Sequence, residues 1–220
     1  MFIIVVGAGS IGSSLIDIAT KKKNNVVVIE RNEVRAKEIS NKYDITVLNG
    51  NATLVETMRE AGSERADALI TTTSDDAVNL MVVSIAEQLK IPSILSVVNE
   101  KEHSDFFRRL GINVLENPDE VVANYLYIAI RRLKVKDFTI LSEGEQIFRI
   151  VVNEGSPLVG RSLADSSSRS TIPTGLLVIA LEHDGKKEIP TPETVITANE
   201  VLTFFSLERA SDELIEKLTG

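Results

Sequence analysis

The stretch FIIVVGAGSIG, residues 2–12, decides the fold of the first part of the chain. An uncharged apolar run leads directly into three glycines spaced G-x-G-x-x-G, and a helical pattern follows. The first glycine permits a tight turn, the second lets backbone approach a pyrophosphate, and the third lets helix pack on strand. The N–H groups and positive dipole end of that helix attract phosphate. The candidate phosphate-binding residues are Gly7, Ala8, Gly9, Ser10, Ile11 and Gly12.

Beyond this stretch, apolar runs alternate with helical patterns over the first two thirds of the chain. The runs are β-branched and nearly continuous, which is typical of parallel strands covered on both faces. Parallel strands need crossover helices, so the alternation predicts an α/β, Rossmann-like, doubly wound parallel sheet of six strands. Helices are expected at Glu33–Tyr43 and Leu54–Ala61, among others. The predicted strands are Phe2–Val6, Val26–Glu30, Ile45–Leu48, Ala68–Thr71, Ile94–Val98 and Asn113–Leu115.

An acid ends the second predicted strand, where the ribose of a nucleotide would lie. Glu30 stands close to the expected ~20 residues beyond the glycines. Its carboxylate would accept hydrogen bonds from the ribose hydroxyls and repel a 2′-phosphate. This favours NAD or an adenosine phosphate over NADP as the ligand. Arg31 beside it would stack on adenine or pair with a 2′-phosphate, and the alternative is a solvated surface residue.

The third predicted strand also ends in polar residues. The Asn51 amide, next to Ala52, would donate to and accept from an adenine edge. The alternative is that this segment only caps the following helix, with Thr53 as the capping residue.

The fourth predicted strand leads into a run of hydroxyl and acidic side chains. Thr72 and Thr73 would lie across the cleft from the glycine loop, at the carboxyl edge of the sheet where ligands bind. Asp75 and Asp76 fall at the start of the next helix. Acids there complement the helix dipole, so we interpret both as caps rather than ligands.

Asn117 and Pro118 open a long apolar helix. Asn caps free N–H groups, Pro is tolerated at the first helical position, and Glu120 completes a pattern like a capping box. Residues Val121–Ile130 are apolar almost all round, which indicates burial on several sides. We interpret this helix as shared with a second chain, and burial against the chain's own C-terminal domain is the alternative.

After about residue 136 the pattern changes, and we place a domain boundary there. Residues 1–136 form the nucleotide-binding domain, including a crossover helix at about 118–134, and residues 137–220 form a small α+β domain. Short turns join its strands, so its sheet is expected to be mostly antiparallel, and a last helix follows Ser211. The predicted strands of this domain are Phe138–Leu141, Gln146–Val152, Leu176–Leu181 and Val201–Ser206.

Composition excludes several classes of function. The chain has 220 residues, a net charge of −8 and no cysteine. Disulfides, cysteine-ligated zinc, iron–sulfur clusters and thiol catalysis are therefore excluded. The acidic balance argues against a nucleic-acid partner. No stretch reaches ~20 apolar residues without a charge, so we expect a soluble, cytoplasmic protein.

The residues of an enzyme are not evident. Hydride transfer needs an acid or base beside the nicotinamide. His103 is expected to be exposed at the start of a helix, and His183 falls in a predicted turn. A small NAD-dependent oxidoreductase stays open as the alternative function, and a nucleotide-sensing repressor as a third.

Further motifs follow the glycines and Glu30 in a fixed order and end before a long apolar helix. They are Gly50-Asn51-Ala52-Thr53, Ala61-Gly62, Thr73-x-x-Asp76-x-x-Asn79, Gly111 and Asn117-Pro118-Asp119. Together they resemble the motifs of a known family. The family is that of the Trk/Ktr-type potassium-transport regulatory subunits, whose domains are called RCK domains. The resemblance covers the whole chain, because the TrkA_C module of that family is also a small α+β domain.

Three positions bear on how this chain would differ from or match the family. Asn51 stands where members usually carry Asp, and Leu95–Val98 lacks an Arg that many members carry in the fifth strand. The missing cation predicts weaker binding of a triphosphate. Asp119 matches an acid that in some relatives faces the phosphates and takes a divalent cation, and it is equally a helix N-terminal acid.

The resemblance implies a non-enzymatic, nucleotide-sensing regulatory subunit. Its ligand would be NAD(H) or an adenosine nucleotide, that is ATP, ADP or AMP. Paired Rossmann domains would form a homodimer, and the dimers would assemble into a ring. That ring would gate a membrane-embedded potassium channel or transporter from the cytoplasmic, inner face of the membrane.

Overall fold

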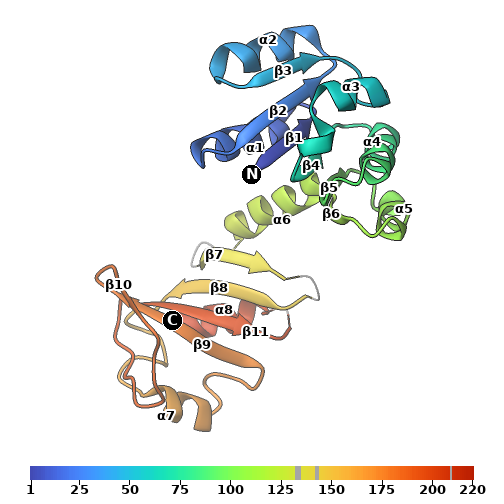
Figure 1. The fold of residues 1–220 in the computed structure, drawn as a ribbon. Coiled ribbons are helices and arrows are strands. Elements are labelled where there is room, and N and C mark those ends of the chain that lie inside the picture. Colours follow the sequence, from blue (N-terminus) through green and yellow to red (C-terminus); the bar gives the residue numbers. More distant parts are fainter. Residues whose placement is uncertain (132–134, 142–143, 209) are drawn as a thin grey trace. The chain divides into compact units, whose positions relative to one another are not determined.

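A computed structural model describes residues 1–131, 135–141, 144–208 and 210–220 (Figure 1). They form two compact units, Met1–Val121 and Val122–Gly220. The boundary near residue 136 that the sequence suggested, with the crossover helix in the first domain, stays a prediction. In the part of the chain that the structure describes, no helix is both long and apolar enough to cross a membrane.

The first unit is built on a six-stranded parallel sheet in the order β3-β2-β1-β4-β5-β6. This confirms the predicted fold class and all six strands, with ends shifted by at most one residue. The order reverses between β1 and β4, which is where a doubly wound sheet opens a ligand crevice. The strands are β1 (Phe2–Val6), β2 (Asn25–Glu30), β3 (Thr46–Asn49), β4 (Ala68–Thr71), β5 (Ser93–Val98) and β6 (Asn113–Glu116).

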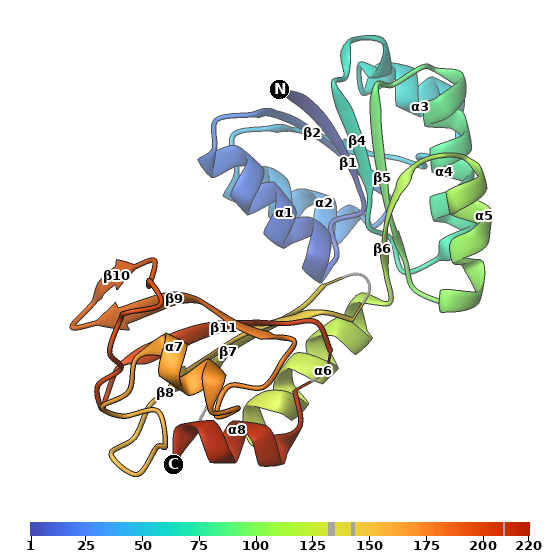
Figure 2. The same ribbon diagram turned by 90° about the horizontal axis from the view of Figure 1, so that it is seen from below.

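Helices cover both faces of this sheet, as Figure 2 shows. Successive residues of a strand point to opposite faces. Ile4 and Val6 of β1 therefore pack against one helix layer, and Ile3 and Val5 against the other. Because both sides are buried, the strands are apolar without alternation. One face carries α1 (Ser10–Lys21) and α2 (Glu33–Lys42), and the other carries α3 (Val55–Glu60), α4 (Asp76–Gln88) and α5 (Ser104–Arg109).

Helix α6 (Pro118–Arg131) starts as the sequence predicted. The Asn117 side chain accepts a hydrogen bond from the Glu120 N–H at 3.4 Å and donates one to the Glu120 carboxylate at 2.7 Å. The predicted end of the helix, at about 134, falls on residues 132–134, which lie outside the described residues.

The apolar side chains of α6 are mostly exposed. Ile128 is buried in the core of the second unit. In contrast, Val121, Leu126 and Ile130 are 58%, 56% and 75% exposed. The chain by itself leaves most of this apolar helix uncovered.

The second unit is a five-stranded antiparallel sheet in the order β10-β9-β11-β8-β7. Phe148 and Phe204 stack at its centre with ring centroids 5.4 Å apart. The Ser211 hydroxyl accepts a hydrogen bond from the Leu214 N–H and caps the last helix, as predicted. The strands and helix are β7 (Val135–Ile140), β8 (Gln146–Val151), β9 (Leu176–His183), β10 (Lys186–Glu188), β11 (Val201–Ser206) and α8 (Asp212–Thr219).

One helix and one strand of this unit were not predicted. Helix α7 (Leu163–Ser168) lies in a segment that the sequence suggested only as a polar patch. The turn predicted at residues 183–186 is shorter than expected, because His183 is the last residue of β9 and Lys186 is the first residue of β10.

Candidate nucleotide-binding site

A cleft of about 740 Å³ opens at the carboxyl ends of the strands of the first unit. Every predicted site residue except Gly12 lines it, and so does Asp119 at its edge. Gly12 is buried behind the loop instead. The predicted residues that line the cleft are Gly7, Ala8, Gly9, Ser10, Ile11, Glu30, Arg31, Asn51, Ala52, Thr72 and Thr73.

The glycine loop turns tightly between β1 and α1. Gly7 has φ +90°, and a Cβ there would lie 3.2 Å from Thr73 Cγ2. A Cβ on Gly12 would lie 2.1 Å from the Gly7 carbonyl oxygen and 2.7 Å from Thr72 Oγ1. Gly12 therefore allows α1 to pack against the loop, and its part in the site is to shape that loop.

Gly9 has the opposite surroundings. A Cβ there would meet no atom within 4 Å, so the backbone faces open space in the cleft. Gly9 is also the N-cap of α1, and no side chain caps the helix. The N–H groups of the first turn are thus available to an anion, as a helix N-terminus requires for phosphate binding.

Glu30 is only 6% exposed, and its carboxylate accepts hydrogen bonds from two backbone N–H groups. Its Oε2 accepts a hydrogen bond from the Ala8 N–H at 2.6 Å, and its Oε1 accepts one from the Asn32 N–H at 2.7 Å. The carboxylate therefore fixes the glycine loop to the β2–α2 turn. Each carboxylate oxygen can accept a second hydrogen bond, so a ribose contact remains open to it.

The segment after β3 differs from the expected cap. The Asn51 side chain accepts hydrogen bonds from the Thr53 N–H at 3.1 Å and the Thr53 hydroxyl at 2.9 Å. Thr53 as helix cap is wrong, because the N-cap of α3 is Leu54 and no side chain caps it. Asn51 closes the turn with its side-chain oxygen, and the residue lines the cleft.

The β4 side of the cleft is tied to the glycine loop. Thr72 Oγ1 donates to the Gly7 carbonyl at 3.0 Å. Thr73 Oγ1 donates to the fully buried Asn79 Oδ1 at 2.7 Å, and Asn79 Nδ2 donates back to the Thr73 carbonyl at 2.9 Å. The wall formed by Thr72 and Thr73 is therefore held on both sides.

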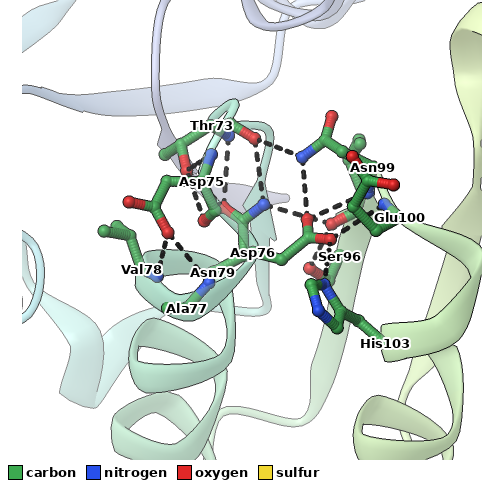
Figure 3. A network of polar contacts seen from close by, with 11 residues as sticks. Thr73, Asp75, Asp76, Ala77, Val78, Asn79, Ser96, Asn99, Glu100 and His103 are labelled. Atoms are coloured by element: carbon green, nitrogen blue, oxygen red, sulfur yellow. Dashed lines mark hydrogen bonds and ion pairs between the residues drawn. The ribbon is translucent and has the colours of Figure 1, made fainter.

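The two acids after this wall have different roles. Asp75 caps α4 by accepting from the Ala77 and Val78 N–H groups, as predicted. The same prediction for Asp76 is wrong, because its carboxylate is buried and bonded to the segment after β5 (Figure 3). His103 belongs to that contact: its side chain is 47% exposed, yet its Nδ1 lies 2.9 Å from Asp76.

Sequence reasoning missed several polar residues of the lining, among them Arg35, Glu38 and Asn99. Arg31, Arg35 and Glu38 recur at helical spacing directly after Glu30, and that spacing was a usable signal. Asn99 directly follows β5, at the same edge of the sheet at which Thr72 directly follows β4. Its position at the end of a strand was therefore a signal that could have identified it.

Among the residues that the structure describes, no three acidic or histidine side chains converge as metal ligands. Asp119 is exposed at the cleft edge, and a cation there stays a prediction.

Comparison of the sequence with models of known protein families identifies the family of the chain. The sequence model of the TrkA-N domain matches residues 3–118, more than half of the chain. The chain belongs to the TrkA-N domain family. A TrkA-C domain model matches residues 147–219. The family resemblance suggested by the motifs is thereby confirmed.

Relatives of this TrkA-N chain are named potassium uptake proteins. A "Trk system potassium uptake protein TrkA homolog" of Methanothermobacter thermautotrophicus is 27% identical over 220 residues, 100% of both chains. A homolog of Pyrococcus abyssi is 26% identical and covers 97% of this chain and 96% of its own. TrkA of Azorhizobium caulinodans is 30% identical, over 93% of this chain and 45% of that protein. The chain thus spans nearly the whole length of the Methanothermobacter and Pyrococcus relatives but less than half of the Azorhizobium one.

Solved structures share the fold of this TrkA-N chain. The GsuK channel matches with a TM-score of 0.65 and 23% identity, over 100% of this chain and 39% of that chain. A structure described as the GsuK channel bound to NAD matches with a TM-score of 0.61 and 22% identity, over 100% and 39% of the chains. GsuK bound to ADP matches with a TM-score of 0.51 and 29% identity, over 59% and 33%.

Proposed function

We propose that the chain is a nucleotide-sensing regulatory subunit of a membrane-embedded potassium channel or transporter. The observation that carries the proposal is the cleft, in which an uncapped helix N-terminus and open backbone at Gly9 lie beside the buried acid Glu30. That combination suits the diphosphate and ribose of an adenosine nucleotide. The transport role is supported by family membership and by the names of the relatives.

The proposed ligand is NAD(H) or one of ATP, ADP and AMP. Backbone amides of Gly7–Ile11 would hold the phosphates, and Glu30 the ribose hydroxyls. Arg31, Asn51 and Ala52 would face the adenine, and Thr72 and Thr73 the second half of a dinucleotide. The ADP-bound GsuK structure, which is 29% identical over the matched part, supports an adenosine ligand.

The proposed assembly is a homodimer through α6, with dimers forming a ring. Side chains such as Leu126 and Ile130 are more than half exposed in the single chain, and they would be buried against a second copy. The ring would lie in the cytoplasm at the inner face of the membrane, held there by its transport partner.

Regulation imposes a thermodynamic requirement on the proposed ring. A nucleotide shifts a conformational equilibrium only if it binds the two conformations with different affinity. The ligand would thus act by selecting one ring conformation.

Calorimetric titration of the chain with NADH, ATP, ADP and AMP tests the proposal. We expect binding of at least one of them, and Glu30→Ala should weaken it by about 1.5–3 kcal/mol because charge-assisted hydrogen bonds are lost. Glu33→Ala is the matched control, because Glu33 is exposed and outside the cleft lining. Equal affinity of the Glu30 variant and wild type would refute the placement of the ribose.

A cellular and a chemical assay separate regulator from enzyme. Expression in cells that lack their own regulatory subunit should restore potassium uptake. Substrate-dependent reduction of NAD by the purified chain would instead favour a small NAD-dependent oxidoreductase.

A further inference from the structure

Asp76 begins α4 but its carboxylate points into the protein (Figure 3). The residue is 8% exposed. Its Oδ1 accepts from the Asn99 N–H at 2.9 Å and Asn99 Nδ2 at 2.8 Å. Its Oδ2 accepts from the Glu100 N–H at 2.9 Å and lies 2.9 Å from His103 Nδ1. The single buried carboxylate of Asp76 thus contacts Asn99, Glu100 and His103, all of which follow β5.

The chemistry of these partners requires a carboxylate. Burial raises the pKa of Asp76, but hydrogen bonds from Asn99, Glu100 and His103 outweigh burial and bring the pKa below its ordinary value. An ionised carboxylate only accepts, so the His103 ring donates from Nδ1. An amide of the same shape would fail here, because either orientation of its NH₂ turns a donor toward a backbone N–H.

The same carboxylate reaches the cleft through one side chain. Asn99 lines the cleft, and its Nδ2 bridges Asp76 Oδ1 and the Thr73 carbonyl, the latter at 3.1 Å. Thr73 also lines the cleft and packs beside Gly7. Asp76 itself does not line it.

We propose that Asp76 is a positioning residue of the nucleotide site, whose carboxylate holds Asn99, and through it Thr73, in the wall formed by the ends of β4 and β5. The proposal rests on the nucleotide-binding function proposed above. Asp76 does not line the cleft, so its effect on the nucleotide passes through Asn99. Substituting it therefore weakens binding without removing any group that touches the nucleotide.

The test is titration of the full chain with ADP and with NADH, for wild type and Asp76→Asn. We expect about tenfold weaker binding by Asp76→Asn, because a buried N–H of the wall loses its acceptor. Asp67→Asn is the matched control: Asp67 precedes β4 at the opposite edge of the sheet and accepts a hydrogen bond from the Phe2 N–H at 2.7 Å. That variant should bind like wild type.

A double-mutant cycle distinguishes positioning from a general loss of stability. If Asp76 acts through Asn99, the effects of Asp76→Asn and Asn99→Leu on affinity are not additive. Either change alone already removes the contact between the two side chains that holds the wall in place. Additive effects would show that Asp76 acts by another route and would overturn the proposal.

The outcomes separate this inference from the function on which it rests. Wild type that binds neither ligand refutes the proposed nucleotide site, and the role of Asp76 falls with it. Wild type that binds while a folded Asp76→Asn binds within about twofold of it refutes only the positioning role. If Asp76→Asn does not fold, Asn99→Leu decides: about tenfold weaker binding supports the proposal, and unchanged binding overturns it.

Discussion

Gly9 precedes helix α1 and Gly12 lies in its first turn, and the two positions favour glycine for different reasons. At Gly12 the restriction is steric, because an added Cβ would lie 2.1 Å from the Gly7 oxygen. At Gly9 the fold leaves room, and a side chain would compete only with the proposed ligand. Fold and ligand binding thus constrain neighbouring positions separately.

This difference predicts opposite responses to substitution. Gly12→Ala should destabilise the first unit by about 2 kcal/mol or more, because backbone must move to admit the methyl group. Gly9→Ser should leave stability unchanged or raise it by a few tenths of a kcal/mol, because Ser suits an N-cap, yet it should weaken nucleotide binding. Urea unfolding and calorimetry measure the two effects. A Gly9→Ser variant that binds ADP and NADH normally would contradict the placement of the phosphates.

The Asp76 carboxylate also predicts a dependence of stability on pH. Its pKa in the folded chain lies below the ordinary value of 3.8, so its ionised form contributes stability above that value. This contribution is lost as the pH falls through the lower, folded pKa. Asp76→Asn should therefore be less stable than wild type at pH 7, with the difference shrinking below about pH 4. Urea midpoints across pH give the measurement, and a constant difference would contradict the assignment.

Helix α6 has an apolar sequence that the contacts within a single chain do not explain. Ile128 packs into the second unit, but Ile130, two residues later, is 75% exposed. An apolar surface of this kind normally marks a protein–protein contact.

We expect Ile130→Glu to dissociate the proposed dimer, because an unpaired charge buried at an interface costs about 3–5 kcal/mol. The exposed Asn124 on the same helix provides the control, since Asn124→Glu adds the same charge at a polar position. Sedimentation velocity should give a monomer for Ile130→Glu and a dimer for the control. A wild-type monomer at the same concentration would refute the assembly.

The sequence predicted the strands of the first unit but missed helix α7, and both outcomes have a physical explanation. The strands of the sheet are buried on both faces, so their apolar runs are continuous and were predictable, as was Glu30 at a strand end. Helix α7 was not, because its sequence LADSSS has little helical propensity. It is held by its Ser162 cap and by the Ser166 carbonyl, which accepts from the Thr171 and Ile172 N–H groups.

The role of Asp76 was beyond local reasoning for a related cause. An acid at a helix start is ordinarily a cap, as Asp75 is here. Only the pairing of β4 with β5 brings the Asn99 and Glu100 N–H groups to Asp76, 23 and 24 residues away along the chain.

The two compact units have separate hydrophobic cores, and all residues that line the cleft lie in the first. A ligand that binds only the folded form stabilises it by about 2.7 kcal/mol at 100 times its dissociation constant. We expect ADP or NADH at that excess to slow hydrogen exchange in β1–β6, with little change in residues 147–219. Equal protection of both units would contradict a site confined to the first.

The hydrogen bonds from the Ala8 N–H to Glu30 and from Thr72 to the Gly7 carbonyl are all internal to the chain. The shape of the glycine turn is therefore set during folding, and a nucleotide bound there as proposed would cost little further conformational entropy in that turn. The association rate constant should then be governed by diffusive encounter and orientation. Differences in affinity among nucleotides should lie mainly in their dissociation rate constants.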